Sequence, residues 1–182
     1  MAACAKHANI YFNDEKLKYT FENYMDLYIG KKSETPRVFE IVNSKWEVGL
    51  ALNNDQNFDC ISFVNGINTS KGGKHVDYIV NQICKKLVEV IKKKHKTNIS
   101  PKFIKDNIIL FIKCTIDNLG FNSQTKEFMT TNKDKFGSKC EISEKFIEKL
   151  IDRIIRYVQK LPLFDYTNFY YHLMWRWWRW LK

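Results

Sequence analysis

Glycine and proline are scarce in this chain of 182 residues, which has only 7 glycines and 3 prolines. Collagen-like chains, flexible linkers and largely disordered chains need far more of both residues, so the composition excludes these classes. No apolar run reaches the ~18 residues that span a bilayer, and the first residues lack the apolar core of a secretory signal. These absences predict a soluble, intracellular body of one packed domain, with room for a short appendage.

The chain also has no CxxC pair, and its five cysteines are odd in number and widely spaced. Closely paired cysteines are typical of zinc sites and redox motifs, and an even, regular set is typical of disulfide-rich secreted domains. We therefore expect buried or idle thiols in a reducing compartment and no metal site.

Positive charge is in excess, because 30 lysines and arginines face 20 acidic residues and leave a net charge of +10. Such an excess indicates an anionic partner, either nucleic acid or a membrane surface. Half of the excess lies in residues 85–96, which hold six lysines and one glutamate. The last twenty residues, 163–182, hold nine of the 27 aromatic residues and four of the five tryptophans.

The spacing of apolar residues predicts an α+β fold. Residues 10–17 read as a short strand running into a polar turn, and residues 46–52 alternate as a half-buried strand does. Further strands are predicted at residues 38–42, 60–64 and 108–112, the last in a central position. Helices are predicted after Thr20, over residues 76–91, after Ser100 and after Ser143. This order suits a mixed sheet covered by helices.

Two features near the start of the long helix could suggest chemistry. Residues 70–74 could be a phosphate cradle or a tight glycine turn, and the turn is favoured because the segment matches neither GxxxxGK[ST] nor GxGxxG. His75 and Asp77 could be an acid–base pair, but residues two apart on a helix face different ways. We interpret them as surface and capping residues.

Two other features could bind phosphate. Lys92, Lys93, Lys94 and Lys96 end the long helix, and their spacing leaves open a solvated helix end or contacts to nucleic-acid phosphates. Gln124 and Lys126 lie in a long irregular stretch, residues 118–138, and combine an amide donor with a positive charge. On an extended loop, residues two apart point the same way, which suits holding one phosphate.

Residues 65–78, 92–94, 121–127 and 143–147 resemble, in order and spacing, the transducer domain of eukaryotic-type DNA topoisomerase II, over about residues 8–158. The resemblance implies a ribosomal-protein-like second domain of GHKL proteins. It divides the chain into the end of a GHKL ATPase domain with its connecting helix (1–31), a transducer domain (32–160) and an aromatic-rich tail (161–182).

The resemblance also implies a function: part of an ATP-dependent isomerase that couples ATP binding and hydrolysis to DNA strand passage. It implies that Gln124 and Lys126 contact the terminal phosphate of ATP, with Lys126 catalytic, and that Lys92, Lys93, Lys94 and Lys96 contact double-stranded DNA. ATP and Mg²⁺ are the implied cofactors of the intact enzyme, and none is expected to bind this chain alone. The other implied partners are the ATPase and DNA-cleavage domains and a second copy in a homodimer, in the nucleus.

The nucleotide pocket, the acidic metal-binding module and the cleavage tyrosine of that family have no match in this sequence. We therefore expect a fragment that has no turnover by itself. The alternative is a non-catalytic DNA-binding or inhibitory protein derived from this domain. Residues 161–182 leave three interpretations open: an interfacial membrane segment, a surface that stacks on bases, or out-of-frame translation. No membrane partner is expected except through this tail.

Overall fold

A five-stranded sheet forms the centre of the protein, whose computed structural model describes residues 9–17, 20–53, 57–95 and 99–160. The strand order is β3-β4-β7-β5-β6. The central strand, β7 (Ile108–Cys114), pairs antiparallel with β4 (Trp46–Leu52) and parallel with β5 (Asp59–Val64). The edges are β3 (Arg37–Asn43) and β6 (Ile67–Asn68). The sheet is therefore mixed, and the central position predicted for residues 108–112 is confirmed.

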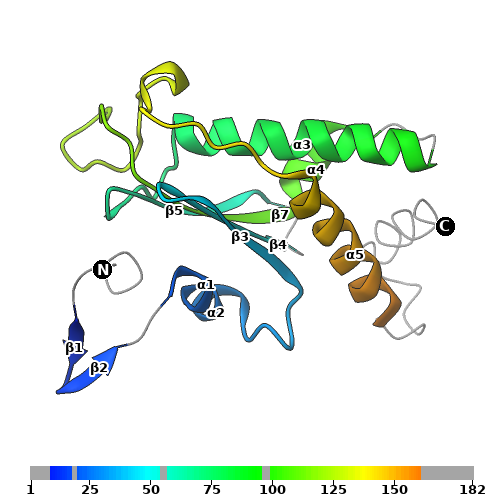
Figure 1. Cartoon of the computed structure of the whole chain (residues 1–182), viewed down its shortest axis with the longest axis horizontal. Coiled ribbons are helices and arrows are strands. Elements are labelled where there is room, and N and C mark those ends of the chain that lie inside the picture. Colours follow the sequence, from blue (N-terminus) through cyan, green and yellow to red (C-terminus); the bar gives the residue numbers. More distant parts are fainter. Residues whose placement is uncertain (1–8, 18–19, 54–56, 96–98, 161–182) are drawn as a thin grey trace.

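Three helices cover one face of this sheet: α3 (Lys74–His95), α4 (Pro101–Asp106) and α5 (Glu144–Lys160) (Figure 1). Their buried side chains, among them Ile83 and Leu150, join those of the strands, among them Trp46 and Leu110, in one apolar core. The helices follow the predicted positions because one apolar stripe on each of them meets the sheet.

Three of the predicted helix starts are seen as capped N-termini. The hydroxyl of Thr20 accepts a hydrogen bond from the N–H of Asn23 at 3.1 Å. The hydroxyl of Ser100 accepts a hydrogen bond from the N–H of Phe103 at 3.1 Å, and the hydroxyl of Ser143 accepts one from Phe146 at 3.0 Å. Each bond satisfies a backbone donor that has no partner within its own helix.

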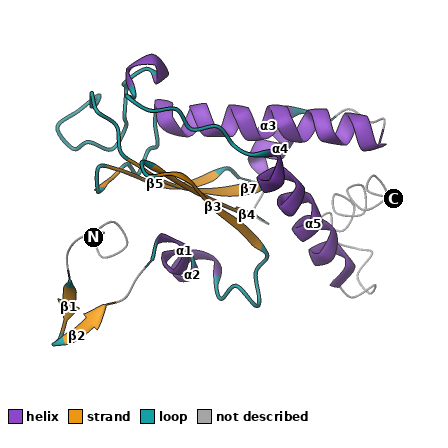
Figure 2. Cartoon of the chain, viewed as in Figure 1, coloured by secondary structure: helices purple, strands orange, loops and turns teal. Residues whose placement is uncertain are grey.

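Two short helices, α1 (Phe21–Tyr24) and α2 (Asp26–Ile29), cover the opposite face of the sheet (Figure 2). Met25, between them, is fully buried, and a Cβ placed on Gly49 of β4 would lie only 2.5 Å from its sulfur. The prediction that β4 is half-buried is therefore wrong, because both of its faces are covered. The buried Arg37 guanidinium pairs with Asp26 and with the carbonyl of Gly30, which ties α2 to β3.

Residues 10–17 form a hairpin and not one strand followed by a turn. β1 (Ile10–Phe12) pairs antiparallel with β2 (Glu15–Leu17). Asn13 and Asp14 connect the strands with φ values of 47° and 62°. Two-residue hairpin turns need positive φ at these positions, and Asn and Asp tolerate it better than most residues.

The cysteines of the described residues are free thiols, as predicted: Cys60, Cys84, Cys114 and Cys140. Burial raises the pKa of Cys140 to about 12, so its thiol stays protonated at neutral pH.

Candidate functional site

The loop of residues 118–138, called here the Gln-Thr-Lys loop, leaves the end of β7 and returns past the start of α3 (Figure 1). Its tip is a tight turn, in which the N–H of Lys126 donates to the carbonyl of Ser123 at 3.1 Å. Lys126 itself has a φ of 58°. The expectation of an extended loop is therefore wrong at the tip, where a left-handed residue reverses the chain.

Gln124 and Lys126 are both exposed at this tip. Among the described residues, neither side chain takes part in a hydrogen bond or ion pair. An ammonium group and an amide donor are thus both available to an anionic group that approaches from outside the chain.

The loop has an outgoing limb, residues 118–122, and a returning limb, residues 127–131, and the returning limb is bonded to the turn that begins α3. The N–H of Lys71 donates to the carbonyl of Glu127 at 3.0 Å, and the N–H of Lys74 donates to the carbonyl of Met129 at 2.9 Å. The N–H of Met129 donates back to the carbonyl of Gly72 at 3.1 Å. These bonds occupy backbone N–H groups that a phosphate cradle would need, so the glycine segment is the tight turn that the sequence favoured.

Glycine at position 73 is required for this contact. Gly73 has a φ of 140°, and a Cβ there would lie 2.3 Å from the carbonyl oxygen of Met129. The loop and α3 can approach each other this closely only because residue 73 has no side chain.

An exposed ion pair adds to the same junction. The Lys71 ammonium lies 2.6 Å from a carboxylate oxygen of Glu127. The hydrogen bond and charge of the Lys71 ammonium lower the pKa of the Glu127 carboxyl.

His75, in the first turn of α3, is fully buried, so its interpretation as a surface or capping residue is wrong. Its Nε2 lies 3.3 Å from the hydroxyl of Thr69, which in turn bonds to Ser62 on β5. Burial lowers the pKa of His75 from 6.5 to about 3, so the ring is neutral at physiological pH. Asp77 is exposed.

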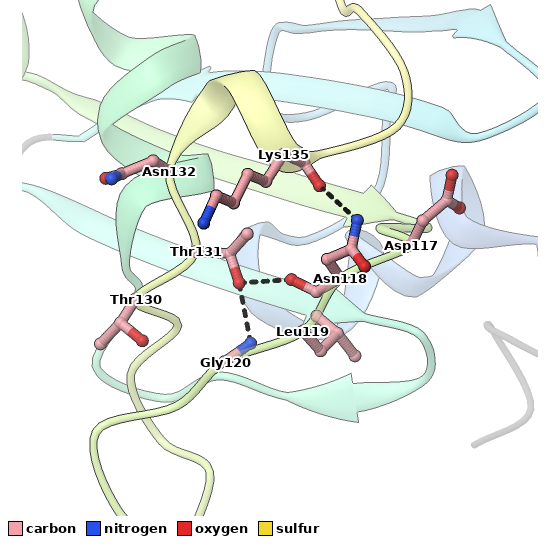
Figure 3. Close-up of a pocket in the computed structure, with 8 residues that line it drawn as sticks. All are labelled: Asp117, Asn118, Leu119, Gly120, Thr130, Thr131, Asn132 and Lys135. Atoms are coloured by element: carbon pink, nitrogen blue, oxygen red, sulfur yellow. Dashed lines mark hydrogen bonds between the residues drawn. The ribbon is translucent and has the colours of Figure 1, made fainter.

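A pocket of about 590 Å³ lies at the base of the Gln-Thr-Lys loop (Figure 3). Thr131 belongs to the returning limb, and its side chain reaches the outgoing limb. Its hydroxyl bonds to both the N–H of Gly120 and the carbonyl of Asn118. Lys135, from the 3₁₀ helix η1 (Lys133–Lys135), also lines this pocket. Nothing in the sequence singles out Thr131, because a hydroxyl that joins two limbs leaves no periodic signal.

The predicted lysine cluster lies at the other end of α3. Lys92 and Lys93 are exposed. Lys94 belongs to α3 but its side chain is not described, and Lys96 lies outside the described residues. A helix of 22 residues is about 33 Å long, so α3 separates these lysines from the Gln-Thr-Lys loop by most of the length of the domain.

No group of three or more His, Cys, Asp or Glu side chains is placed to hold a metal ion within the described ranges. Within the same ranges, no helix is long and apolar enough to cross a bilayer.

Comparison with known proteins gives concordant matches. The DNA gyrase B family profile matches residues 10–160. DNA topoisomerase 2-beta of Mus musculus is 42% identical over 172 residues, which cover 87% of this chain and 11% of that protein. DNA topoisomerase 2 of Bombyx mori is 46% identical over 155 residues, which cover 81% of this chain and 10% of that protein.

A solved structure agrees with these sequence matches. The crystal structure of the ATPase and transducer domains of DNA topoisomerase II from Balamuthia mandrillaris superposes with a TM-score of 0.75 at 39% identity. The match covers 84% of this chain and 38% of that structure. The chain thus spans about a tenth of the length of the curated relatives it matches. The mixed α+β fold, the extent of the profile match and the level of identity together show that the chain belongs to the DNA gyrase B family, with eukaryotic type II DNA topoisomerases as its relatives.

Proposed function

We propose that the chain is the coupling part, or transducer, of an ATP-dependent type II DNA topoisomerase. In this proposal residues 1–31 end the ATPase domain and connect it to the transducer of residues 32–160. The chain links ATP binding and hydrolysis in the ATPase domain to strand passage of double-stranded DNA. It acts with the ATPase and DNA-cleavage domains in a homodimer, in the nucleus.

The observation that carries the proposal is the placement of two candidate phosphate-contacting groups at opposite ends of α3. The Gln-Thr-Lys loop is bonded to the turn at the start of the helix, and the lysine cluster lies at its end. A helix that packs along one face as a single element moves as a rigid body when either end is displaced. The arrangement therefore suits transmission between a nucleotide and DNA.

At the loop, Gln124 and Lys126 would contact the terminal phosphate of ATP. Their exposure and their lack of partners within the described residues support this role. ATP supplies the phosphoryl group, and Lys126 acts as the catalytic residue of this chain by stabilising the negative charge on that group. Mg²⁺ and the remainder of ATP would be held by the ATPase domain.

At the other end of α3, Lys92, Lys93, Lys94 and Lys96 would contact the phosphate backbone of DNA. Lysine ammonium groups neutralise phosphates and release counterions without reading the base sequence. The alternative, a non-catalytic DNA-binding protein, uses these lysines but gives no role to Lys126.

The test measures ATP turnover in a protein that joins this chain to the upstream ATPase domain of a type II topoisomerase. Lys126→Ala should lower kcat at least about tenfold, because a charge aimed at the reacting phosphate is lost. Lys133→Ala, which removes another exposed lysine of the same loop, is the matched control and should leave kcat unchanged. Undiminished turnover of Lys126→Ala would refute the catalytic role, and duplex binding that persisted would then favour the alternative.

A further inference from the structure

We propose that Thr131 is a positioning residue, whose hydroxyl joins the two limbs of the Gln-Thr-Lys loop and so sets where the tip presents Gln124 and Lys126. This inference rests on the proposed function of the loop.

The two limbs differ in how they are held. The returning limb is bonded to the start of α3 through the main chain of Glu127 and Met129. Beyond Asp117, the outgoing limb is joined to the returning limb by main-chain bonds at 2.9 Å, from Thr130 to Gly120, and at 3.2 Å, from Asn122 to Phe128. Leu119 and Phe121 of the outgoing limb also pack against the core, so the hydrogen bonds between the limbs set the register of this limb and do not hold it alone.

Thr131 supplies two further bonds, each shorter than these main-chain bonds. Its hydroxyl accepts from the N–H of Gly120 at 2.7 Å and donates to the carbonyl of Asn118 at 2.7 Å. In a regular antiparallel pair, the N–H of Gly120 would instead donate to the carbonyl of Thr130. The Thr131 side chain thus takes the place of a main-chain partner where the limbs diverge (Figure 3).

The burial of Thr131 and the pocket beside it allow its effect on loop position to be tested apart from its effect on the stability of the fold. Thr131 is 9% exposed, so valine, which has nearly the same shape, keeps its packing but loses both bonds. Gly120 and Asn118 line the pocket of about 590 Å³, where water can bond to the groups that are released. Thr131→Val should therefore loosen the outgoing limb while the domain stays folded.

The first experiment uses the full chain and measures amide hydrogen exchange at Gly120. Thr131→Val should speed exchange at Gly120 at least about tenfold. Thr131→Ser, which keeps the hydroxyl, should retain protection. Thr130→Val is the matched control, because the exposed Thr130 hydroxyl makes no hydrogen bond within the described residues. Equal protection in Thr131→Val and the parent chain would overturn the inference.

The second experiment measures kcat and KM for ATP in the protein that carries the upstream ATPase domain. Thr131→Val should lower kcat roughly tenfold with little change in the thermal midpoint, because a catalytic group displaced by about 1 Å loses much of its effect. Thr131→Ser should restore kcat, which a loss of packing alone would not predict. If Thr131→Val does not fold, Thr131→Ala takes its place, with the same expected result.

The two proposals fail in different ways. If Lys126→Ala lowers kcat and Thr131→Val does not, the positioning role is overturned and the proposed function stands. If neither change lowers kcat, both are overturned. An equal loss in Thr130→Val would show that kcat responds to any change in the limb, and would also overturn the positioning role.

Discussion

At the scale of single residues, the buried cluster of Ser62, Thr69 and His75 joins β5 to the first turn of α3. Its hydroxyl groups bond to each other and to the main chain, whereas Nδ1 of His75 is buried without a partner in the described structure. Burial removes a charged imidazole at this position from bulk solvent, which disfavours the protonated form. The low pKa of His75 follows from that burial.

This burial predicts that stability depends on pH. The unfolded chain binds a proton at His75 near pH 6.5, and the folded chain binds it only near pH 3. Between these values the unfolded state holds more protons, so the free energy of unfolding should fall as the pH falls, by up to about 1.4 kcal/mol per pH unit from this group. The contribution of the neutral His75 to the free energy of unfolding should be fully present well above pH 6.5.

His75→Gln keeps a polar group near Thr69 but cannot titrate. The variant should be less stable than the parent chain at pH 7, and the difference should shrink as the pH is lowered to 4.5. Urea unfolding at several pH values measures both proteins. A difference that stayed constant over this range would contradict the burial of a neutral His75.

At the scale of elements, the junction between α3 and the Gln-Thr-Lys loop depends on the absence of a side chain at position 73. The parallel bridge between Gly73 and Met129 brings two main chains together, and three backbone hydrogen bonds surround it. The start of α3 and the returning limb are therefore parts of one unit, although the sequence places them far apart.

Gly73→Ala should lower the free energy of unfolding by about 2 kcal/mol or more, because the new Cβ meets the Met129 main chain and the backbone is strained at this φ. Gly66→Ala is the matched control. Gly66 also has a positive φ, of 81°, but a Cβ there would have no neighbour within 4 Å. Gly66→Ala should lower the free energy of unfolding by about 1 kcal/mol, through backbone strain alone. Equal losses in the two variants, measured by chemical denaturation, would show that the contact with Met129 contributes nothing.

At the scale of the whole molecule, charge is distributed unevenly over a domain whose two candidate contact regions lie at opposite ends of one helix. Along the outer face of α3, exposed lysines alternate with Asp77 and Glu89, so the helix is not a continuous basic stripe. The lysine cluster that follows Ile91 contributes four positive charges within five residues, against a net charge of +10 for the whole chain. Binding of DNA by the chain should therefore depend on this end of the molecule.

The lysine cluster predicts a steep loss of duplex affinity as salt is raised. Changing Lys92, Lys93 and Lys94 to Ala should reduce the slope of log K against log salt by about one for each lysine that contacts a phosphate. Fluorescence anisotropy with a short duplex at several salt concentrations measures this slope. The control changes three exposed lysines outside the cluster: Lys133, Lys139 and Lys145. An unchanged slope in the cluster variant, or an equal change in the control, would rule out the assignment.

Local patterns of residues were sufficient to predict several parts of this protein. Helical spacing, the caps Ser100 and Ser143, and the apolar run at residues 108–112 each specify an element through neighbours a few residues away, so the α+β class was predictable. The order of short motifs, including residues 121–127, was enough to indicate the family.

Burial and the contacts between distant segments follow only from the folded chain. β4 alternates as a half-buried strand does, yet α1 and α2 cover its second face. The sequence around His75 suggests a surface residue, yet the ring is buried beside Thr69, which bonds to Ser62 of β5. The partners of Gly73 and Thr131 were likewise hidden, because hydrogen bonds between segments far apart in the chain depend on how the chain folds back and not on the spacing of residues along it.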